Sequence, residues 1–256
     1  MSSTILETKG LMKAFGSFLA ANHIDFSLEE GALESVIGPN GAGKTTLFNL
    51  LSGKLRADAG AIRFNGTDIT NSSPKAIIEL GLVRSFQISS IFPGLSVFDN
   101  ILLPVIKRRK KELSFFRPAK RQRSMEKEVR EVLQRVGLEK HAGLRVDLLP
   151  YGDKRRLDIG IALARQFRLL LLDEPTAGLN PEETLAIVQL IKRLHKEEKK
   201  SILFIEHNVN LVLDISERIT VLQQGRVIAS GSPDEIQKNK AVREAYFGEE
   251  LSDVGS

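Results

Sequence analysis

Cysteine is missing from the whole 256-residue sequence. Without it the chain forms no disulfide and offers no thiolate for catalysis or metal binding, which fits a cytoplasmic setting. No apolar run approaches the roughly 18–20 residues that a helix needs to cross a bilayer. The opening residues, MSSTILETKG, lack the basic start and apolar stretch of a secretory signal. We therefore expect a protein that does not itself cross a membrane.

What the sequence does contain is the composition of an ordinary globular protein, with 42% apolar and 27% charged residues. A disordered chain would have fewer apolar residues and a larger charge imbalance. Neither a repeat with a period of roughly 20–50 residues nor a Gly/Ser linker divides the chain. The formal net charge of +5 suits an anionic ligand or an anionic membrane surface. The length suffices for one large α/β domain or two small ones, and we expect a single domain over residues 1–256.

Short apolar runs predict a mostly parallel sheet. Residues 1–37 alternate apolar and polar side chains, which is typical of a β-rich opening. Runs expected of parallel strands buried on both faces lie at Leu33–Ile37, which is strand-like, and at Leu169–Leu172 and Ser201–Ile205, which are short continuous apolar runs. Residues 220–230 predict a late hairpin.

A helix is predicted between the last two of these runs. Asn180 can cap it, and Pro181 suits its first position. Strand, helix and strand in this order form a βαβ unit. The residues expected on its buried face are Leu185, Val188, Ile191 and Leu194.

Glu34 fits this pattern poorly, because it falls inside a run that should be buried on both faces. An unpaired buried carboxylate is costly. We expect that Glu34 either points to a sheet edge or has a basic partner that the sequence does not identify.

A glycine-rich stretch matches the complete phosphate-loop pattern G-x-x-x-x-G-K-[ST]. It follows the run that ends at Ile37 and precedes a helical segment, the context that phosphate binding requires. The glycines let several backbone N–H groups point at phosphate oxygens, and the helix dipole adds positive potential there. Lys44 would reach the β- and γ-phosphates of a nucleotide, and the Thr45 hydroxyl would ligate Mg²⁺. The predicted nucleotide contacts are Gly38, Pro39, Asn40, Gly41, Ala42, Gly43, Lys44, Thr45 and Thr46.

Two acidic residues follow the apolar run Leu169–Leu172. Asp173 is placed to hold Mg²⁺, and Glu174 can polarise the attacking water as a general base. Two acids after a buried strand are common in α/β proteins, so this pair gains its meaning from the phosphate loop. Together the two motifs predict binding of ATP with Mg²⁺ and hydrolysis of the ATP.

With these motifs the chain resembles the ATP-binding subunits of ABC transporters over nearly its whole length. The resemblance implies that Phe15 stacks on adenine and that Gln87, in VRSFQ, links Mg²⁺ to the transporter contact. It also implies that His207, in ILFIEH, contacts the γ-phosphate and takes part in catalysis with Lys44 and Glu174. A lone Phe, Gln or His is often a core or surface residue, but their order and spacing make the set specific.

The family's signature, Leu-Ser-Gly-Gly-Gln, is matched less closely. In the family it opens a helix whose N-terminus faces the γ-phosphate bound by the other subunit, so the matching residues are expected nucleotide contacts. Pro150 removes a hydroxyl and an amide donor, and Asp153 places a negative charge where an anion should bind. We expect a weakened signature, in which Pro150→Ser and Asp153→Gln would raise ATP turnover. The matching residues are Leu149, Pro150, Tyr151, Gly152 and Asp153, where Tyr151-Gly152 looks like the variant of branched-chain amino-acid uptake systems.

The implied fold is an α/β P-loop NTPase. It has a RecA-like core with a mostly parallel sheet, an N-terminal antiparallel β subdomain and an inserted helical lobe at roughly residues 88–165. A strongly basic run at 107–123 falls in this lobe. It could contact lipid headgroups, although a solvated charged loop is the simpler interpretation.

The resemblance also implies partners. These are membrane permease subunits, met through the segment after Gln87, and a second ATPase subunit in a homo- or heterodimer, whose contact is the loop Ala177–Asn180. A substrate-binding protein would take part indirectly, and we expect no nucleic-acid partner. The expected location is peripheral, at the cytoplasmic face of the inner membrane.

Three functions remain open on the sequence alone. The first is the energising subunit of a transporter that imports branched-chain or related amino acids, with lipopolysaccharide export as its alternative because the ending AVREAYFGEE is similar there. The second is an ABC ATPase acting on nucleic acid or ribosomes, which usually carries a second ATPase domain or long coiled-coil insertions. The third is a regulatory module without turnover. Lys44, Glu174 and His207 argue against the third function, whereas Pro150 and Asp153 argue for it.

Overall fold

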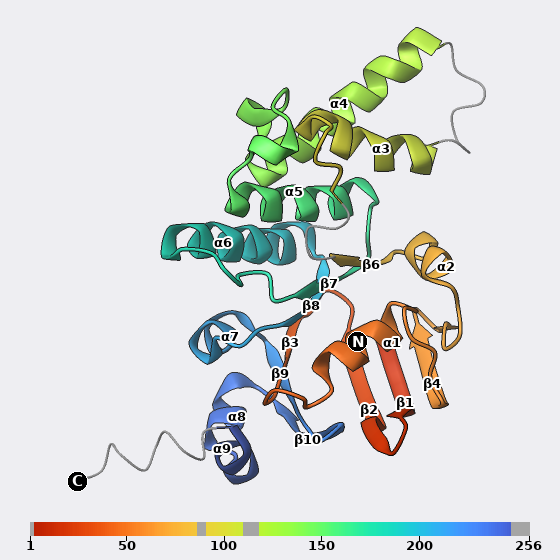
Figure 1. Ribbon diagram of the computed structural model, residues 1–256, viewed down its shortest axis with the longest axis vertical. Coiled ribbons are helices and arrows are strands. Elements are labelled where there is room, and N and C mark those ends of the chain that lie inside the picture. The colour runs from red at the N-terminus through yellow and green to blue at the C-terminus, as the bar shows by residue number, and fades with distance from the viewer. Residues whose placement is uncertain (1–2, 86–90, 110–117, 247–256) are drawn as a thin grey trace. The chain divides into compact units, whose positions relative to one another are not determined.

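The computed structural model describes residues 3–85, 91–109 and 118–246, the side chains of 118–121 and 246 excepted (Figure 1). Gln87 and residues 110–117 of the basic run at 107–123 therefore lie outside the described residues.

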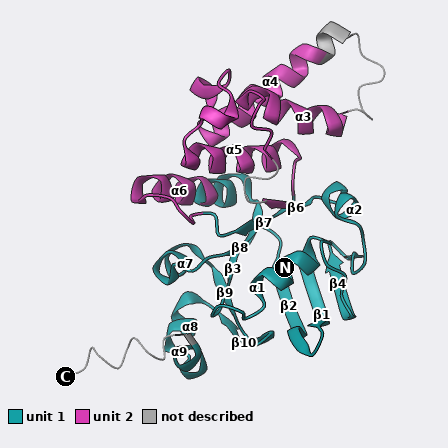
Figure 2. Cartoon of the chain, in the orientation of Figure 1, with its two compact units in different colours: residues 1–82, 168–175, 192–256 teal, residues 83–167, 176–191 magenta. Residues whose placement is uncertain are grey.

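The chain divides into two compact units (Figure 2). Unit 1 takes the described residues within 1–82, 168–175 and 192–256, and unit 2 those within 83–167 and 176–191. The lobe predicted at roughly 88–165 falls in unit 2, which also includes 176–191.

Unit 1 begins with an antiparallel sheet, which confirms the predicted β-rich opening. Its four strands follow the order β2-β1-β4-β5. They are β1 (Thr4–Phe15), β2 (Phe18–Glu29), β4 (Ala59–Phe64) and β5 (Thr67–Asp68).

The second sheet is mostly parallel, as predicted, and has six strands in the order β10-β9-β3-β8-β7-β6. Strand β3 is parallel to both β8 and β9, and β7 is parallel to β8. Strands β9 and β10 pair antiparallel and confirm the late hairpin. The strands are β3 (Leu33–Ile37), β6 (Leu82–Ser85, of which Leu82 falls in unit 1), β7 (Leu169–Asp173), β8 (Ser201–Ile205), β9 (Arg218–Gln223) and β10 (Arg226–Gly231).

Helices complete both units. Those of unit 1 are α1 (Lys44–Leu51), α2 (Pro74–Glu79), α7 (Val209–Ile215), α8 (Pro233–Lys238) and α9 (Lys240–Tyr246). Unit 2 has α3 (Val97–Arg109), α4 (Pro118–Val136), α5 (Tyr151–Ala164) and two short 3-10 helices, Glu139–His141 and Val146–Leu148, while α6 (Pro181–Glu198) passes from unit 2 into unit 1 after Ile191. Within the part of the chain that is described, no helix combines the length and the apolar character needed to span a membrane.

The core of unit 1 lies where α1 meets apolar side chains of both sheets. Leu47 and Phe48 of α1 are fully buried there, together with Leu6 of β1 and with Leu171 and Leu203 of the parallel sheet. This packing fixes α1, and with it the loop that precedes the helix. In unit 2, helices α3, α4 and α5 pack against one another.

Helix α6 begins after Asn180, as predicted, but one residue of its expected apolar face is wrong. Ile191 and Leu194 are buried, whereas Leu185 is 56% exposed. Each step of three residues turns a helix by about 300°, so three steps from Leu185 to Leu194 add up to about half a turn. The two side chains therefore lie on opposite sides.

Glu34 does not point to an edge, because β3 is an inner strand of its sheet. Its side chain is 3% exposed, and among the described residues no group hydrogen-bonds its Oε2. Arg218, its register partner on β9, is the basic neighbour that the sequence did not identify. Burial raises the pKa of the Glu34 carboxyl from 4.5 to about 7, and the charge of Arg218 offsets this only in part.

This buried carboxyl makes stability depend on pH. Between pH 4.5 and about 7 the folded chain keeps the Glu34 proton while the unfolded chain releases it, so stability falls as the pH rises through this window. We expect the wild type to lose about 3 kcal/mol of unfolding free energy across it through Glu34. Glu34→Gln should remove this loss in urea titrations at pH 5, 6, 7 and 8. Glu79→Gln, at an exposed position, should keep the wild-type dependence, and an unchanged pH profile of Glu34→Gln would contradict the assignment.

Candidate active site

The loop from Gly38 to Gly43 joins β3 to α1, and its glycines are required by close backbone approaches. Gly38 and Gly43 have φ angles of 152° and 102°, which L side chains rarely adopt. A Cβ atom on Gly38 would lie 2.1 Å from the Leu222 carbonyl oxygen, and one on Gly43 would lie 2.3 Å from that of Ala20. The loop therefore fits between β2 and the β9–β10 hairpin only with glycine at both positions.

Lys44 is the first residue of α1, and its side chain turns back into this loop. It is 6% exposed, and its Nζ donates to the carbonyl oxygens of Gly38 at 2.6 Å and Pro39 at 3.1 Å. Burial lowers the pKa of the Lys44 ammonium, and the charges of Glu174 and Asp173 oppose this effect. The Lys44 ammonium group thus lies among the backbone groups of the loop, the arrangement that a phosphate chain requires.

The start of α1 is also free to receive an anion. No side chain of the described residues caps this helix, and its first turn holds no acidic residue. The N-terminal amides and the helix dipole therefore favour a negatively charged ligand. Thr45 is exposed and Thr46 half-buried at the same helix start.

The two acids lie where β7 ends. Asp173 is its last residue and pairs with Ile205 of β8. Glu174 has a φ of 49°, uncommon for a residue with a side chain, and its amide donates to the Ile205 carbonyl at 3.0 Å. Such strain persists only where the surrounding structure enforces it, and it is frequent at functional sites.

His207 lies beside Glu174. Its Nε2 is 2.9 Å from Glu174 Oε1, and both side chains are partly open to solvent, at 46% and 35% exposure. The amide of His207 donates to Glu206 Oε2 at 3.2 Å. The strand ends thus bring together a carboxylate and an imidazole that can hold a water molecule between protein and phosphate.

Phe15 ends β1 at the tip of the first hairpin and is 50% exposed. It pairs across the hairpin with Phe18, which is 54% exposed. Lys13 Nζ lies 5.8 Å from the centre of the Phe15 ring. A solvent-facing ring of this kind has a free face for a nucleotide base.

The residues present suit Mg²⁺ as well. The Thr45 hydroxyl is exposed at the start of α1, and Asp173 supplies a carboxylate at the end of β7. Hydroxyl and carboxylate oxygens are the ligands that Mg²⁺ prefers, completed by waters and phosphate oxygens. The third predicted ligand, Gln87, lies outside the described residues.

The signature residues form the start of α5 in unit 2. Leu149 is 4% exposed and Tyr151 39%. Pro150 precedes the helix and provides no side-chain cap. The Gly152 amide donates to Glu183 Oε1 at 3.3 Å.

The contacts of Asp153 correct the expectation that its charge is free to repel phosphate. Its side chain is buried, with Oδ1 2.8 Å from Arg156 Nη2 and Oδ2 3.1 Å from His141 Nδ1. The negative charge at the helix start is therefore compensated within unit 2, whereas the predicted repulsion of phosphate assumed a free charge. Because the Asp153 carboxylate is buried and paired, Asp153→Gln is expected to cost stability and not to raise turnover.

Sequence reasoning missed the role of Glu183. The spacing N-x-x-E in Asn180–Glu183 is a capping-box pattern, and both of its reciprocal bonds are present. The pattern gives no sign of a further bond, which the Gly152 amide donates to Glu183, because that bond joins segments far apart in the sequence.

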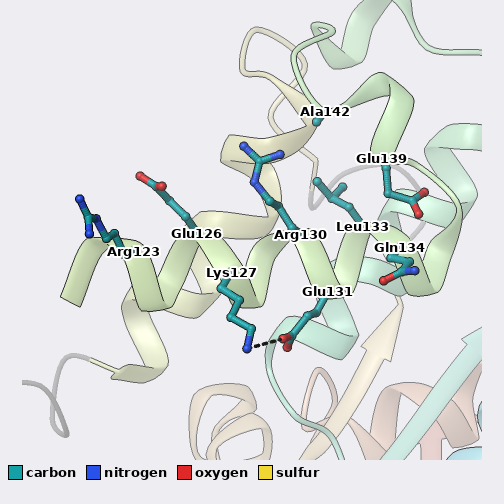
Figure 3. A pocket seen from close by; sticks show the side chains of 9 residues that line it. All are labelled: Arg123, Glu126, Lys127, Arg130, Glu131, Leu133, Gln134, Glu139 and Ala142. Atoms are coloured by element: carbon teal, nitrogen blue, oxygen red, sulfur yellow. Dashed lines mark ion pairs between the residues drawn. The ribbon is translucent and has the colours of Figure 1, made fainter. Parts of the chain in front are cut away.

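Unit 2 also has a surface hollow along α4 (Figure 3). Its lining carries charges of both signs, including Arg123, Arg130 and the ion pair of Lys127 with Glu131. None of the predicted site residues lines it. In the described start of the basic run, Arg108 and Arg109 both pair with Glu128 of α4, which compensates one of their two charges.

The chain is similar to known sequences over its full length. A family model described as "ABC transporter" matches residues 21–177, and one described as "Branched-chain amino acid ATP-binding cassette transporter" matches residues 226–251. The high-affinity branched-chain amino acid transport ATP-binding protein LivG of Salmonella typhimurium is 40% identical over 254 residues, which cover 97% of this chain and 100% of LivG. BraF of Pseudomonas aeruginosa, of the same description, is 40% identical over 257 residues, with 97% and 100% covered.

Solved structures agree with this likeness. The ADP conformation of MJ1267, an ATP-binding cassette of an ABC transporter, has a TM-score of 0.83 at 28% identity and covers 97% of this chain and 100% of that one. The dimeric cassette MJ0796, in a post-hydrolysis state with ADP and Pi, has a TM-score of 0.75 at 25% identity, with 89% and 98% covered. These likenesses confirm the predicted P-loop NTPase fold.

The Asp153 ion pairs lead to a stability prediction. Asp153→Asn should lower the unfolding free energy by about 1–3 kcal/mol, because it removes a buried charge that is paired with Arg156 and His141. Asp147→Asn is the matched control, since Asp147 pairs with Arg145 on the surface, where both side chains are at least 40% exposed. The control should change stability by about 0–1 kcal/mol in the same urea titration. Equal effects of the two substitutions would show that Asp153 is not held as described.

Proposed function

Because this chain belongs to the ABC transporter family, and so binds and hydrolyses ATP, we propose that it energises the import of branched-chain or related amino acids through membrane permease subunits. The observation that carries the cargo assignment is the full-length 40% identity to LivG and BraF. The match of residues 226–251 to the branched-chain cassette model supports it independently of the ATP site.

The hydrolytic mechanism that we propose assigns the steps to residues of unit 1, with Gln87 as the one exception. The loop amides and Lys44 bind the phosphates, and Phe15 stacks on the base. Mg²⁺, held through Thr45, Asp173 and Gln87, would neutralise charge on the phosphate oxygens. Glu174 accepts a proton from the attacking water, and His207, 2.9 Å from Glu174, keeps the carboxylate directed at that water and contacts the γ-phosphate.

Coupling to transport requires a second ATPase subunit, identical or related, with two ATP molecules at the shared interface. ATP favours the closed pair because it adds contacts that form only when both subunits are present, and hydrolysis removes those contacts. The dimeric form of MJ0796 with ADP and Pi supports this arrangement. In this proposal the pair lies at the cytoplasmic face of the membrane and acts on the permeases through the segment after Gln87.

Glu174→Gln tests the assignment of the general base. The amide keeps the shape of the side chain but cannot accept a proton, so ATP turnover should fall by about 10²–10⁴-fold. ATP binding should persist, because the phosphate loop is unchanged, and the closed pair should accumulate on size-exclusion chromatography with ATP. Lys44→Ala is the matched variant, with the opposite expectation of weak ATP binding and no accumulated pair. Normal turnover of Glu174→Gln would remove Glu174 from this role.

The cargo is tested with the assembled transporter. Reconstituted in vesicles with its permeases and binding protein, the chain should support ATP-dependent uptake of labelled leucine, isoleucine or valine. Lys44→Ala should abolish this uptake. Uptake of an unrelated solute, or labelled material leaving the compartment in place of uptake, would contradict the proposal.

A further inference from the structure

Helix α5 begins without a cap of its own. Pro150 occupies the cap position, and proline supplies neither a side-chain acceptor nor an amide donor. Asp153 in the first turn cannot replace it, because its two oxygens are engaged by Arg156 and His141. The first amides of α5 therefore depend on an acceptor from outside the helix.

Glu183, in the first turn of α6, supplies that acceptor. Its Oε1 accepts from the Gly152 amide at 3.3 Å, and its Oε2 accepts from the Asn180 amide at 3.1 Å. Asn180 Oδ1 in turn accepts from the Glu183 amide at 2.9 Å. A single carboxylate thus lies at the N-termini of two helices, where both dipoles stabilise it.

The fit around this carboxylate is close. A Cβ atom on Gly152 would lie 2.8 Å from Glu183 Oε1, so the contact requires glycine. The same two segments also approach each other at Gly178, in the loop before α6, where an added Cβ would lie 3.6 Å from the Tyr151 ring. All of these residues belong to unit 2 (Figure 2).

We propose that Glu183 is a positioning residue that ties the start of α5 to the loop before α6. This inference rests on the proposed function, in which the α5 start and the loop Ala177–Asn180 both meet the opposing subunit. Because one carboxylate binds both segments, they keep a fixed position relative to each other when they meet that subunit. Without it, each segment must be ordered separately when the pair closes, and ordering costs free energy.

The first test compares three substitutions in the assembled transporter. Glu183→Ala should raise the ATP concentration for half-maximal turnover about fivefold, the size expected for the loss of one helix cap. Glu183→Gln should stay close to the wild type, since its amide oxygen can still accept both bonds. Glu182→Ala is the matched control, because it removes the same charge from the same turn of α6 at an exposed position.

A rescue separates α5 from α6. Pro150→Ser restores an acceptor to the start of α5 and leaves α6 untouched. In the Glu183→Ala background it should recover most of the lost apparent ATP affinity, and the recovery should exceed its effect in the wild type. The two substitutions would then be coupled, as expected for groups that serve the same amides.

Hydrogen exchange in the isolated chain provides a measurement that does not need transport. Glu183→Ala should speed the exchange of the first amides of α5, and Glu182→Ala should not. If the proposed function fails, the wild-type complex shows no ATP-dependent uptake while this exchange difference persists. The positioning role of Glu183 is overturned if Glu183→Ala leaves the exchange unchanged, behaves like Glu182→Ala or lowers the ATP concentration for half-maximal turnover. It is also overturned if Pro150→Ser does not recover the apparent ATP affinity of Glu183→Ala.

Discussion

The phosphate loop is built around a buried ammonium group that its own backbone encloses. Lys44 is 6% exposed, and the carbonyl oxygens of Gly38 and Pro39 hold its Nζ. Burying a charge is costly unless hydrogen bonds and opposite charges compensate, and here two carbonyls and the nearby charges of Glu174 and Asp173 do so. Phosphate oxygens offer the same ammonium stronger, charge-assisted bonds. Bound ATP would therefore replace the carbonyl hydrogen bonds of the Lys44 ammonium with stronger ones.

The parallel sheet brings the other residues of the candidate site to one edge. Strands β3, β8 and β7 are neighbours, and the carboxyl ends of parallel strands lie at the same edge of a sheet. Val36 and Asp173 are both register partners of Ile205. Glu174 and His207 follow the ends of β7 and β8 and meet there at 2.9 Å. A shift of one residue in either register would turn these side chains to the other face.

Features that depend on local chemistry could be predicted from the sequence, and features that depend on distant partners could not. The phosphate loop, the late hairpin and the cap at Asn180 follow from short patterns, and the structure contains all three. The contacts of Asp153 with His141 and of Gly152 with Glu183 join separate segments, so no pattern indicates them. For the same reason the strand pattern marked Glu34 as awkward but could not name its neighbour on β9. The role of Gln87 as a Mg²⁺ ligand stays a prediction.

The two departures from the family signature also change meaning once their surroundings are known. Read as isolated substitutions, Pro150 and Asp153 weaken the signature and favour a module without turnover. In the structure the Asp153 charge is compensated by Arg156, and the acceptor that Pro150 lacks comes from Glu183. Each loss is matched by a contact within the same unit, so the altered signature is not evidence of a lost site. With Glu174 and His207 in contact, the geometry agrees with an active ATPase.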